Sequence, residues 1–109
     1  MAPFFRGIAM TASLTLREPL SAEALRGLYE RAYASEPLVR IVTEIPLVRD
    51  AVNLPHATIG GFAVDEERRH AVVVSTLDNL LKGAASQAVQ NLNLAFGLPD
   101  LMGIEPWPS

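Results

Sequence analysis

Hydrophobic and polar residues alternate one by one over residues 8–17, close to the start of the chain. One face of an extended segment would carry the apolar residues Ile8, Met10, Ala12, Leu14 and Leu16. The opposite face would carry Thr11, Ser13, Thr15 and Arg17. A period of two residues is typical of a half-buried β-strand, so we predict a strand here.

Two further apolar runs, 58–64 and 70–77, flank the charged stretch 65–69 and predict a β-hairpin. Residues 71–74 are apolar on both faces, so we expect that strand in the centre of the sheet. A third, short run at 38–43 is rich in β-branched residues and predicts another strand. The segment 44–49, which contains Pro46, fits no element clearly.

Residues 21–34 follow the helical period instead. Apolar side chains recur at Leu25, Leu28, Tyr29, Ala32 and Tyr33, and charged residues lie away from that stripe. Ser21 is a suitable N-cap, and Glu23 favours the positive end of the helix dipole. We therefore predict an amphipathic helix that ends before Pro37.

A second helix is predicted from about Leu80 to Phe96, with Gly97 and Pro99 as its stop. No charged residue follows Lys82 until Asp100, and apolar side chains surround most of the helix. Such a helix is normally buried, and one small sheet has little to cover it with. We expect another domain or subunit to cover it, and we expect Trp107 in the irregular tail to dock on a neighbour.

The predicted order is β-α-β-β-β-α in a single domain over residues 1–109. This order implies an α+β fold with a mixed or antiparallel sheet and helices on one face.

Composition excludes several functions. The formal net charge is −3, so the chain has no basic footprint for nucleic acid. Cysteine is absent, which excludes disulfides and a thiol nucleophile, and neither His56 nor His70 has ligand-like spacing for a metal. No apolar run is long enough to span a membrane, and no signal peptide is recognisable, so we expect a cytoplasmic protein without a membrane partner. Charged residues make up only 19%, which indicates a very complete core or an apolar surface for a partner.

Generic catalytic motifs are weak. Gly60-Gly61 within a strand pattern indicates a bulge or a close backbone approach rather than a dinucleotide fingerprint. Ser75, His70 and Asp78 have no nucleophile elbow to support a triad. The start of the second helix is more informative, because Lys82-Gly83 at a helix N-terminus suits an anion such as a phosphate. From the residues alone, an Asp/Asn cap with a solvated lysine is the more common explanation of the same pattern.

The segment Asp78–Asn93, followed by Phe96-Gly97-Leu98-Pro99, resembles a signature of N-acetyl-γ-glutamyl-phosphate reductases. Aspartate-semialdehyde dehydrogenases share a looser form of it. The start, Pro3–Ile8, and the helix followed by Pro37-Leu38-Val39-Arg40 resemble the same family, so the similarity covers residues 3–104 in order.

The resemblance implies part of a catalytic and dimerisation domain like the C-terminal domain of glyceraldehyde-3-phosphate dehydrogenase. It implies NADPH-dependent reduction of an acyl phosphate to a semialdehyde, in arginine synthesis. The family's catalytic Cys and His are expected upstream, so no catalytic residue is assigned in this chain and the chain alone is expected to be inactive. Two alternatives stay open: the carrier-bound aminoadipate phosphate reductase of lysine synthesis, and a non-catalytic interaction module that kept the fold.

By the same resemblance, Asn79 would contact the nicotinamide amide of NADP, and Lys82 and Gly83 would lie near a cofactor or substrate phosphate. Arg6 is either a contact for the anionic substrate or a structural surface residue. A nucleotide-binding domain and further copies of the protein are the implied partners. One departure concerns residues 53–55, Asn-Leu-Pro, which stand where the family has Gly-Ser/Thr-Asn. His56, which follows them, either compensates or lies on the surface.

Overall fold

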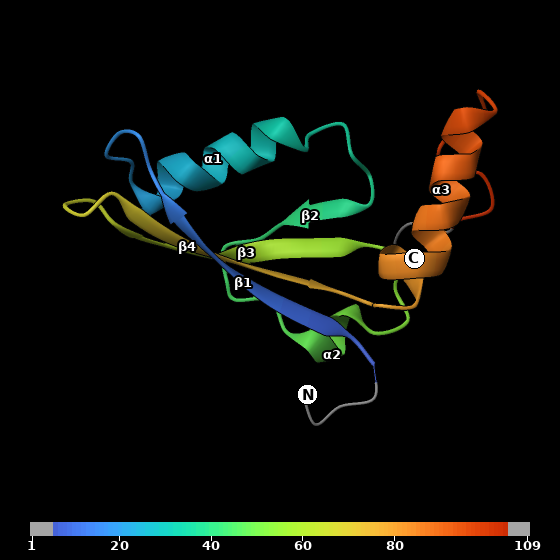
Figure 1. Cartoon of the computed structure of the whole chain (residues 1–109), viewed down its shortest axis with the longest axis horizontal. Coiled ribbons are helices and arrows are strands. Elements are labelled where there is room, and N and C mark those ends of the chain that lie inside the picture. Colours follow the sequence, from blue (N-terminus) through green and yellow to red (C-terminus); the bar gives the residue numbers. More distant parts are fainter. Residues whose placement is uncertain (1–5, 105–109) are drawn as a thin grey trace.

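The computed structural model describes residues 6–104, which form a four-stranded sheet with helices on its faces and at its end (Figure 1). The elements in chain order are β1 (Ile8–Thr15), α1 (Ala22–Ala32), β2 (Val39–Ile41), α2 (Val48–Ala51), β3 (Ala57–Asp65), β4 (His70–Leu77), the π-helical turn η1 (Leu81–Ala85) and α3 (Ser86–Ala95). The strand order is β1-β4-β3-β2. Both neighbours of β4 run antiparallel to it, whereas β2 runs parallel to β3. This arrangement confirms the predicted α+β fold, its mixed sheet and the central position of residues 71–74.

The hairpin of β3 and β4 contains the bulge that the glycine pair indicated. Gly60 lies opposite Val74, but the next paired residue of β3 is Ala63, opposite Val72. A Cβ atom on Gly60 would lie 2.4 Å from the carbonyl oxygen of Glu44, so the close approach requires glycine. Gly61 has a φ of +64°, a left-handed conformation that glycine adopts without strain.

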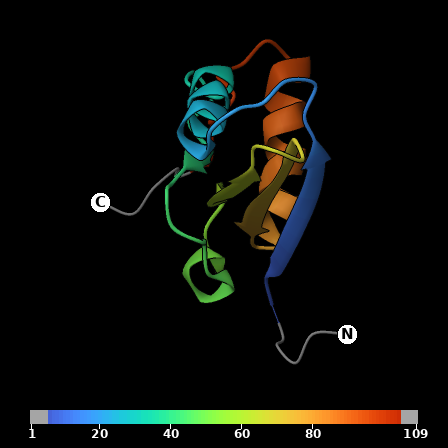
Figure 2. The same cartoon turned by 90° about the vertical axis from the view of Figure 1, so that its left-hand side faces the viewer.

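The hydrophobic core lies between α1 and one face of the sheet (Figure 2). Leu25 of α1 packs there with Ala71 and Val73 of β4. The surrounding partly buried side chains are Leu14, Leu16, Tyr29, Ile59, Phe62 and Val64. The predicted N-cap is confirmed, because the hydroxyl of Ser21 accepts a hydrogen bond of 3.1 Å from the main-chain N–H of Ala24.

The short helix α2, in the segment that the sequence left open, lies on the other side of the sheet from α1 (Figure 1). Thr76 of β4 faces this side and is 1% exposed. A hollow between α2 and the sheet is lined by Arg40, Thr58 and Thr76 together with Asp50. The helices therefore lie on both faces of the sheet and not on one face as predicted, because α2 forms in the segment that the sequence left open; the larger helix, α1, lies on the core side.

The last helix, α3, projects from the end of the sheet (Figure 1), and the residues that it buries are polar. Its buried residues are Ser86, Gln90 and Asn93. Its apolar residues Val89, Leu92 and Phe96 follow one stripe and are 39%, 56% and 72% exposed. We call these three residues the α3 stripe. Within residues 6–104, nothing buries this stripe.

No helix among residues 6–104 combines the length and the apolar character needed to cross a membrane. Pro3 of the N-terminal resemblance and Trp107 of the tail lie outside the described residues, so the docking of Trp107 stays a prediction.

Replacing Leu25 with alanine tests the core. Leu25 is 4% exposed, so Leu25→Ala should lower the free energy of unfolding by about 2–5 kcal/mol through lost burial and a new cavity. The matched control is Leu28→Ala on the same helix, because Leu28 is 46% exposed. Urea unfolding followed by circular dichroism measures both. Equal losses in the two variants would contradict the assigned core.

Candidate functional site

The carboxylate of Asp78, directly after β4, holds three separate segments of the chain together. Asp78 is completely buried. Its Oδ2 accepts a hydrogen bond of 2.6 Å from the N–H of Asn53 and lies 2.7 Å from Nε of Arg6. Its Oδ1 accepts hydrogen bonds of 2.8 and 3.2 Å from the N–H groups of Leu80 and Leu81. The site therefore unites the start of β1, the loop after α2 and the start of η1.

These contacts keep Asp78 ionised. Burial by itself would raise the pKa of this carboxyl group. The hydrogen bonds from the N–H groups of Asn53 and Leu80, together with the guanidinium of Arg6, outweigh burial and hold the pKa below its usual value. A charged carboxylate is thus fixed under the turn that carries the predicted ligand residues.

Asn79 is oriented by the segment that precedes β1. Its Oδ1 accepts a hydrogen bond of 2.8 Å from the N–H of Gly7. The side-chain amide oxygen is thereby occupied, and the NH₂ group remains as the donor end. Gly7 has a φ of +101°, and a Cβ atom there would lie 2.4 Å from Val48 Cγ1, so no other residue fits this position easily. Arg6 and Asn79, two predicted site residues, are therefore neighbours.

The departure at residues 53–55 has a structural counterpart. Asn53 contributes its main-chain N–H to Asp78, and its own backbone is left-handed with a φ of 68°. His56 is 2% exposed, so it does not lie on the surface. Burial, and then the positive charge of Arg40, lower the pKa of His56 to about 4. His56 is consequently neutral at physiological pH.

Lys82 directs its ammonium along α3. Its Nζ donates to Oε1 of Gln87 and, over 3.0 Å, to Oε1 of Gln90. Burial lowers the pKa of Lys82, although the nearby carboxylates of Glu36 and Asp100 act in the opposite direction. The side chain is therefore held by its own chain and is not a solvated lysine. Its contact with a ligand phosphate stays a prediction.

Gly83 packs inward. A Cβ atom there would lie 3.2 Å from Leu77 Cδ1 and 3.4 Å from the carbonyl oxygen of Asp78. Its N–H donates to that same oxygen over 3.0 Å. The close approach of η1 to β4 thus leaves little room for a side chain at Gly83, and the predicted ligand role of Gly83 is a separate hypothesis. Short π-helical turns such as η1 are frequent at functional sites.

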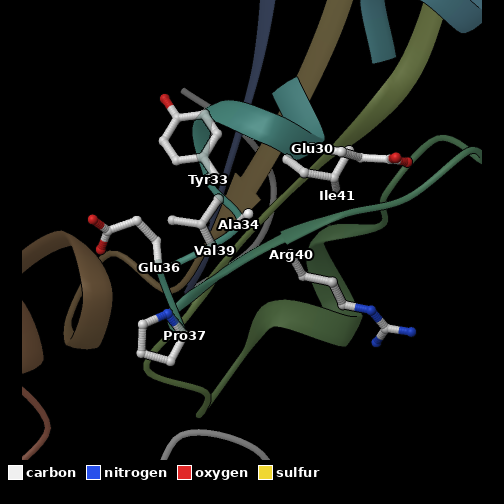
Figure 3. A pocket seen from close by; sticks show the side chains of 8 residues that line it. All are labelled: Glu30, Tyr33, Ala34, Glu36, Pro37, Val39, Arg40 and Ile41. Carbon is white, nitrogen blue, oxygen red and sulfur yellow. The ribbon is translucent and has the colours of Figure 1, made fainter. Parts of the chain in front are cut away.

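Two hollows lie near these elements. The larger, about 640 Å³, runs along β2 and is lined by residues that include Tyr33, Glu36 and Arg40. Figure 3 shows the side chains of Glu36 and Arg40 extending in different directions from this segment, so they do not converge on one ligand. A second hollow of about 280 Å³ adjoins η1, between Pro55, Leu81 and Val89. This hollow and the one between α2 and the sheet, which Leu54 and Thr76 line, both adjoin the candidate site. Residues 6–104 contain no cluster of His, Asp or Glu suited to a metal ion.

Arg6 and Asn79 were predicted as site residues from the sequence, but Asp78 was not predicted as the residue that connects them. From the sequence, Asp78 was interpreted as part of a helix cap, which is correct for the bonds to Leu80 and Leu81. The contacts to Arg6 and Asn53 join positions 72 and 25 residues away from Asp78, and no local pattern reveals them.

Comparison with known proteins agrees with this geometry. Residues 1–79 match the family model described as "Semialdehyde dehydrogenase, dimerisation domain". The chain belongs to this family. The match contains the whole sheet and ends at Asn79, so η1 and α3 lie beyond it.

Curated relatives resemble the chain over almost all of its length. An N-acetyl-gamma-glutamyl-phosphate reductase of Xanthomonas campestris pv. campestris (strain B100) is 51% identical over 95% of this chain. Protein arg11, mitochondrial, of Schizosaccharomyces pombe is 43% identical over the same share. The chain spans 33% of the bacterial relative and 12% of the yeast one. Among solved structures, aspartate semialdehyde dehydrogenase II from Vibrio cholerae has a TM-score of 0.73 and 27% identity, covering 87% of this chain and 28% of that one. The relatives are thus dehydrogenases and reductases of the semialdehyde type.

The buried ion pair predicts an acid-sensitive fold. Asp78→Asn should cost roughly 3 kcal/mol of unfolding free energy, because it leaves Arg6 without its charged partner. Asp65→Asn is the matched control, since the pair of Asp65 with Arg68 is largely exposed and should cost under about 1 kcal/mol. Urea unfolding at pH 7 compares them.

The lowered pKa of Asp78 also predicts how the stability of the fold changes with pH. Because its folded-state pKa lies below the usual value of 3.8, its contribution is present above that pH and is lost as the pH falls below it. The Asp78→Asn variant should lack this part of the acid sensitivity. An identical acid profile in both proteins would contradict the role of the carboxylate.

Proposed function

We propose that this chain is the C-terminal part of an NADPH-dependent N-acetyl-γ-glutamyl-phosphate reductase, an enzyme of arginine biosynthesis in the cytoplasm. The reaction would reduce an acyl phosphate to a semialdehyde. Support comes from a relative named as this reductase, which is 51% identical over 95% of the chain. The matched region makes up 33% of that relative. The observation in the structure that carries the proposal is the paired placement of Arg6 and Asn79 beside buried Asp78.

The donor set of this turn suits a nicotinamide cofactor. The NH₂ group of Asn79 is the free end of an amide whose oxygen is already bound to Gly7, so it is preset to donate to a carboxamide oxygen. NADPH, when bound, supplies the hydride. The main chain at Lys82 and Gly83 lies in the next turn, and we propose that this turn runs beside the cofactor. Asn79 makes the specific contact in this proposal.

Arg6 would serve the anionic substrate. Its Nε lies 2.7 Å from Oδ2 of Asp78, and its side chain is 25% exposed. A guanidinium has further N–H donors, which suit the oxygens of a phosphate. Asp78 would then fix the direction of the guanidinium, as an acidic partner does at many anion sites.

The covalent chemistry would come from the rest of the enzyme. The chain has no cysteine, so the thiolate that forms a thioester, and the histidine that transfers protons, would lie upstream. We propose a nucleotide-binding domain as the partner that supplies the cofactor's binding site. The isolated chain should therefore show no NADPH-dependent reduction of acyl phosphates.

Two surfaces are available for two kinds of partner. The sheet face opposite α1 carries small or β-branched side chains along β1 and β4, away from the end at Thr76 that α2 adjoins, and such a face suits packing against another sheet. We propose it as the contact with a second copy, in line with the dimerisation description of the family that matches residues 1–79. The α3 stripe lies beyond that match, and we propose that it packs on the nucleotide-binding domain.

A chimera tests this function. The 104 matched residues of the Xanthomonas campestris relative would be replaced by those of this chain. We expect NADPH-dependent reduction of N-acetyl-γ-glutamyl phosphate by the chimera and none by the isolated chain. A folded but inactive chimera, beside an active parent enzyme, would contradict the proposal and favour a non-catalytic module.

In this chimera, Asn79→Asp separates the two ends of the Asn79 side chain. The aspartate keeps an oxygen to accept the N–H of Gly7, but it has no NH₂ donor for the cofactor. We expect KM for NADPH to rise about tenfold, as for the loss of one hydrogen bond of about 1.4 kcal/mol. Thermal stability is the control and should change little. An unaltered KM would rule out the contact between Asn79 and the cofactor.

A further inference from the structure

The inner face of α3 carries a continuous polar cluster around Lys82. The ammonium of Lys82 donates to the side-chain oxygens of Gln87 and Gln90. The other end of the Gln90 amide, Nε2, donates over 3.1 Å to Oδ2 of Asp100. The amide of Gln87 is likewise oriented, because its Nε2 donates over 3.0 Å to Oδ1 of Asn91. Each of the two amides that accept a hydrogen bond from the ammonium is thus also held by a bond from its own nitrogen.

Asn93 extends this cluster to the turn after the helix. Its Nδ2 donates to the carbonyl oxygens of Asp100, over 3.0 Å, and of Met102, over 2.9 Å. The main-chain carbonyl oxygen of Asn93 accepts a hydrogen bond of 2.8 Å from the N–H of Leu98. Segment 98–102 is therefore bound to α3 through side chains of the helix as well as through its main chain.

The buried face of α3 is polar, whereas a surface helix normally buries its apolar side chains. Gln90 and Asn93 are each 5% exposed, whereas the apolar side chains of the same helix face outward. Buried amides are stable only when their polar groups find partners: the Gln90 amide has a partner at each end, and Nδ2 of Asn93 donates to two carbonyl oxygens. Polar bonds, not hydrophobic packing, thus hold the inner face of α3.

The surroundings of Lys82 are poor for an anionic ligand. Two carboxamide oxygens touch its Nζ, and the carboxylates of Glu36 and Asp100 lie close enough to favour the ammonium. A phosphate placed there would be repelled by both carboxylates. Lys82 is also the only lysine among the nine basic residues of the chain. The remaining basic residues are all arginines, and a guanidinium can bind two phosphate oxygens at once, which the ammonium of a lysine cannot do in the same way.

We infer that Lys82 is a positioning residue, which acts through Gln90 and Asp100 to lock α3 and segment 98–102 onto the turn that carries Asn79. In this role its ammonium does not contact the cofactor. Lys82 lies in η1, three residues after Asn79, so the lock fixes the direction of α3 relative to the site. It also turns the α3 stripe outward. The inference rests on the proposed function only in treating Asn79 as a cofactor contact. The bonds of Lys82, Gln90 and Asp100 are independent of that function.

The single lysine makes the experiment direct. The chain would be labelled with ¹³C at the lysine ε-carbon, which gives one signal, that of Lys82, in the NMR spectrum. The variants are Gln90→Leu, Lys82→Met, their double variant and Asp100→Asn. Glu67→Gln, which neutralises an exposed carboxylate in the β3–β4 turn, is the control for charge. The measurements are the pKa of Lys82, the hydrogen-exchange rates of α3 amides, and the response of the lysine signal to inorganic phosphate.

The lock predicts that Gln90→Leu and Lys82→Met each speed amide exchange in α3 about tenfold, as for the loss of a charged hydrogen bond. The double variant should exchange no faster than either single one, because both remove the same interaction. Asp100→Asn, a conservative change, should lower the pKa of Lys82, whereas Glu67→Gln should not. Phosphate should leave the lysine signal unmoved.

Two results would overturn the inference. One is additive exchange effects in the double variant together with an unchanged lysine pKa in Asp100→Asn. The other is a saturable shift of the Lys82 signal on adding phosphate, which would show that the ammonium binds the anion. An inactive chimera would contradict the proposed function alone, because the exchange rates and the lysine pKa are measured without it.

Discussion

The carboxylate of Asp78 is the contact on which the rest of the site depends. It has no exposure to solvent, and it binds the start of β1 through Arg6, the loop after α2 through Asn53, and the start of η1 through two N–H groups. A buried charge is stable only when such partners surround it, so its loss would release all three segments together. The orientation of Asn79, bound to Gly7 beside Arg6, follows from this arrangement.

The helix that follows this turn has the reverse of an ordinary amphipathic pattern. A surface helix normally turns its apolar stripe to its own core, but α3 buries Gln90 and Asn93 and exposes Leu92 and Phe96. An exposed apolar stripe on a helix held from behind by polar bonds is suited to a partner surface. The chain spans a third of its bacterial relative, and we propose that this surface packs on a domain outside the chain.

The sequence predicted every strand, both longer helices and the bulge at Gly60-Gly61, because periodicity and turn residues are local signals. It also predicted that α3 would lack a cover within the chain, since its uncharged stretch exceeds what one sheet can bury. It did not predict α2, which is a single turn around Asp50, or the polar inner face of α3. Gln90 and Asn93 appear as ordinary surface residues in the sequence, and only the return of segment 98–102 shows that they are buried.

If the α3 stripe packs on a nucleotide-binding domain, as proposed, the accessibility of residue 92 should differ between the isolated chain and the chimera. The chain has no cysteine, so Leu92→Cys introduces its only thiol. The rate of maleimide labelling at this residue would be measured by peptide mass spectrometry in the isolated chain and in the chimera. The account predicts fast labelling in the isolated chain and strong protection in the chimera. Equally fast labelling in a folded, active chimera would contradict it.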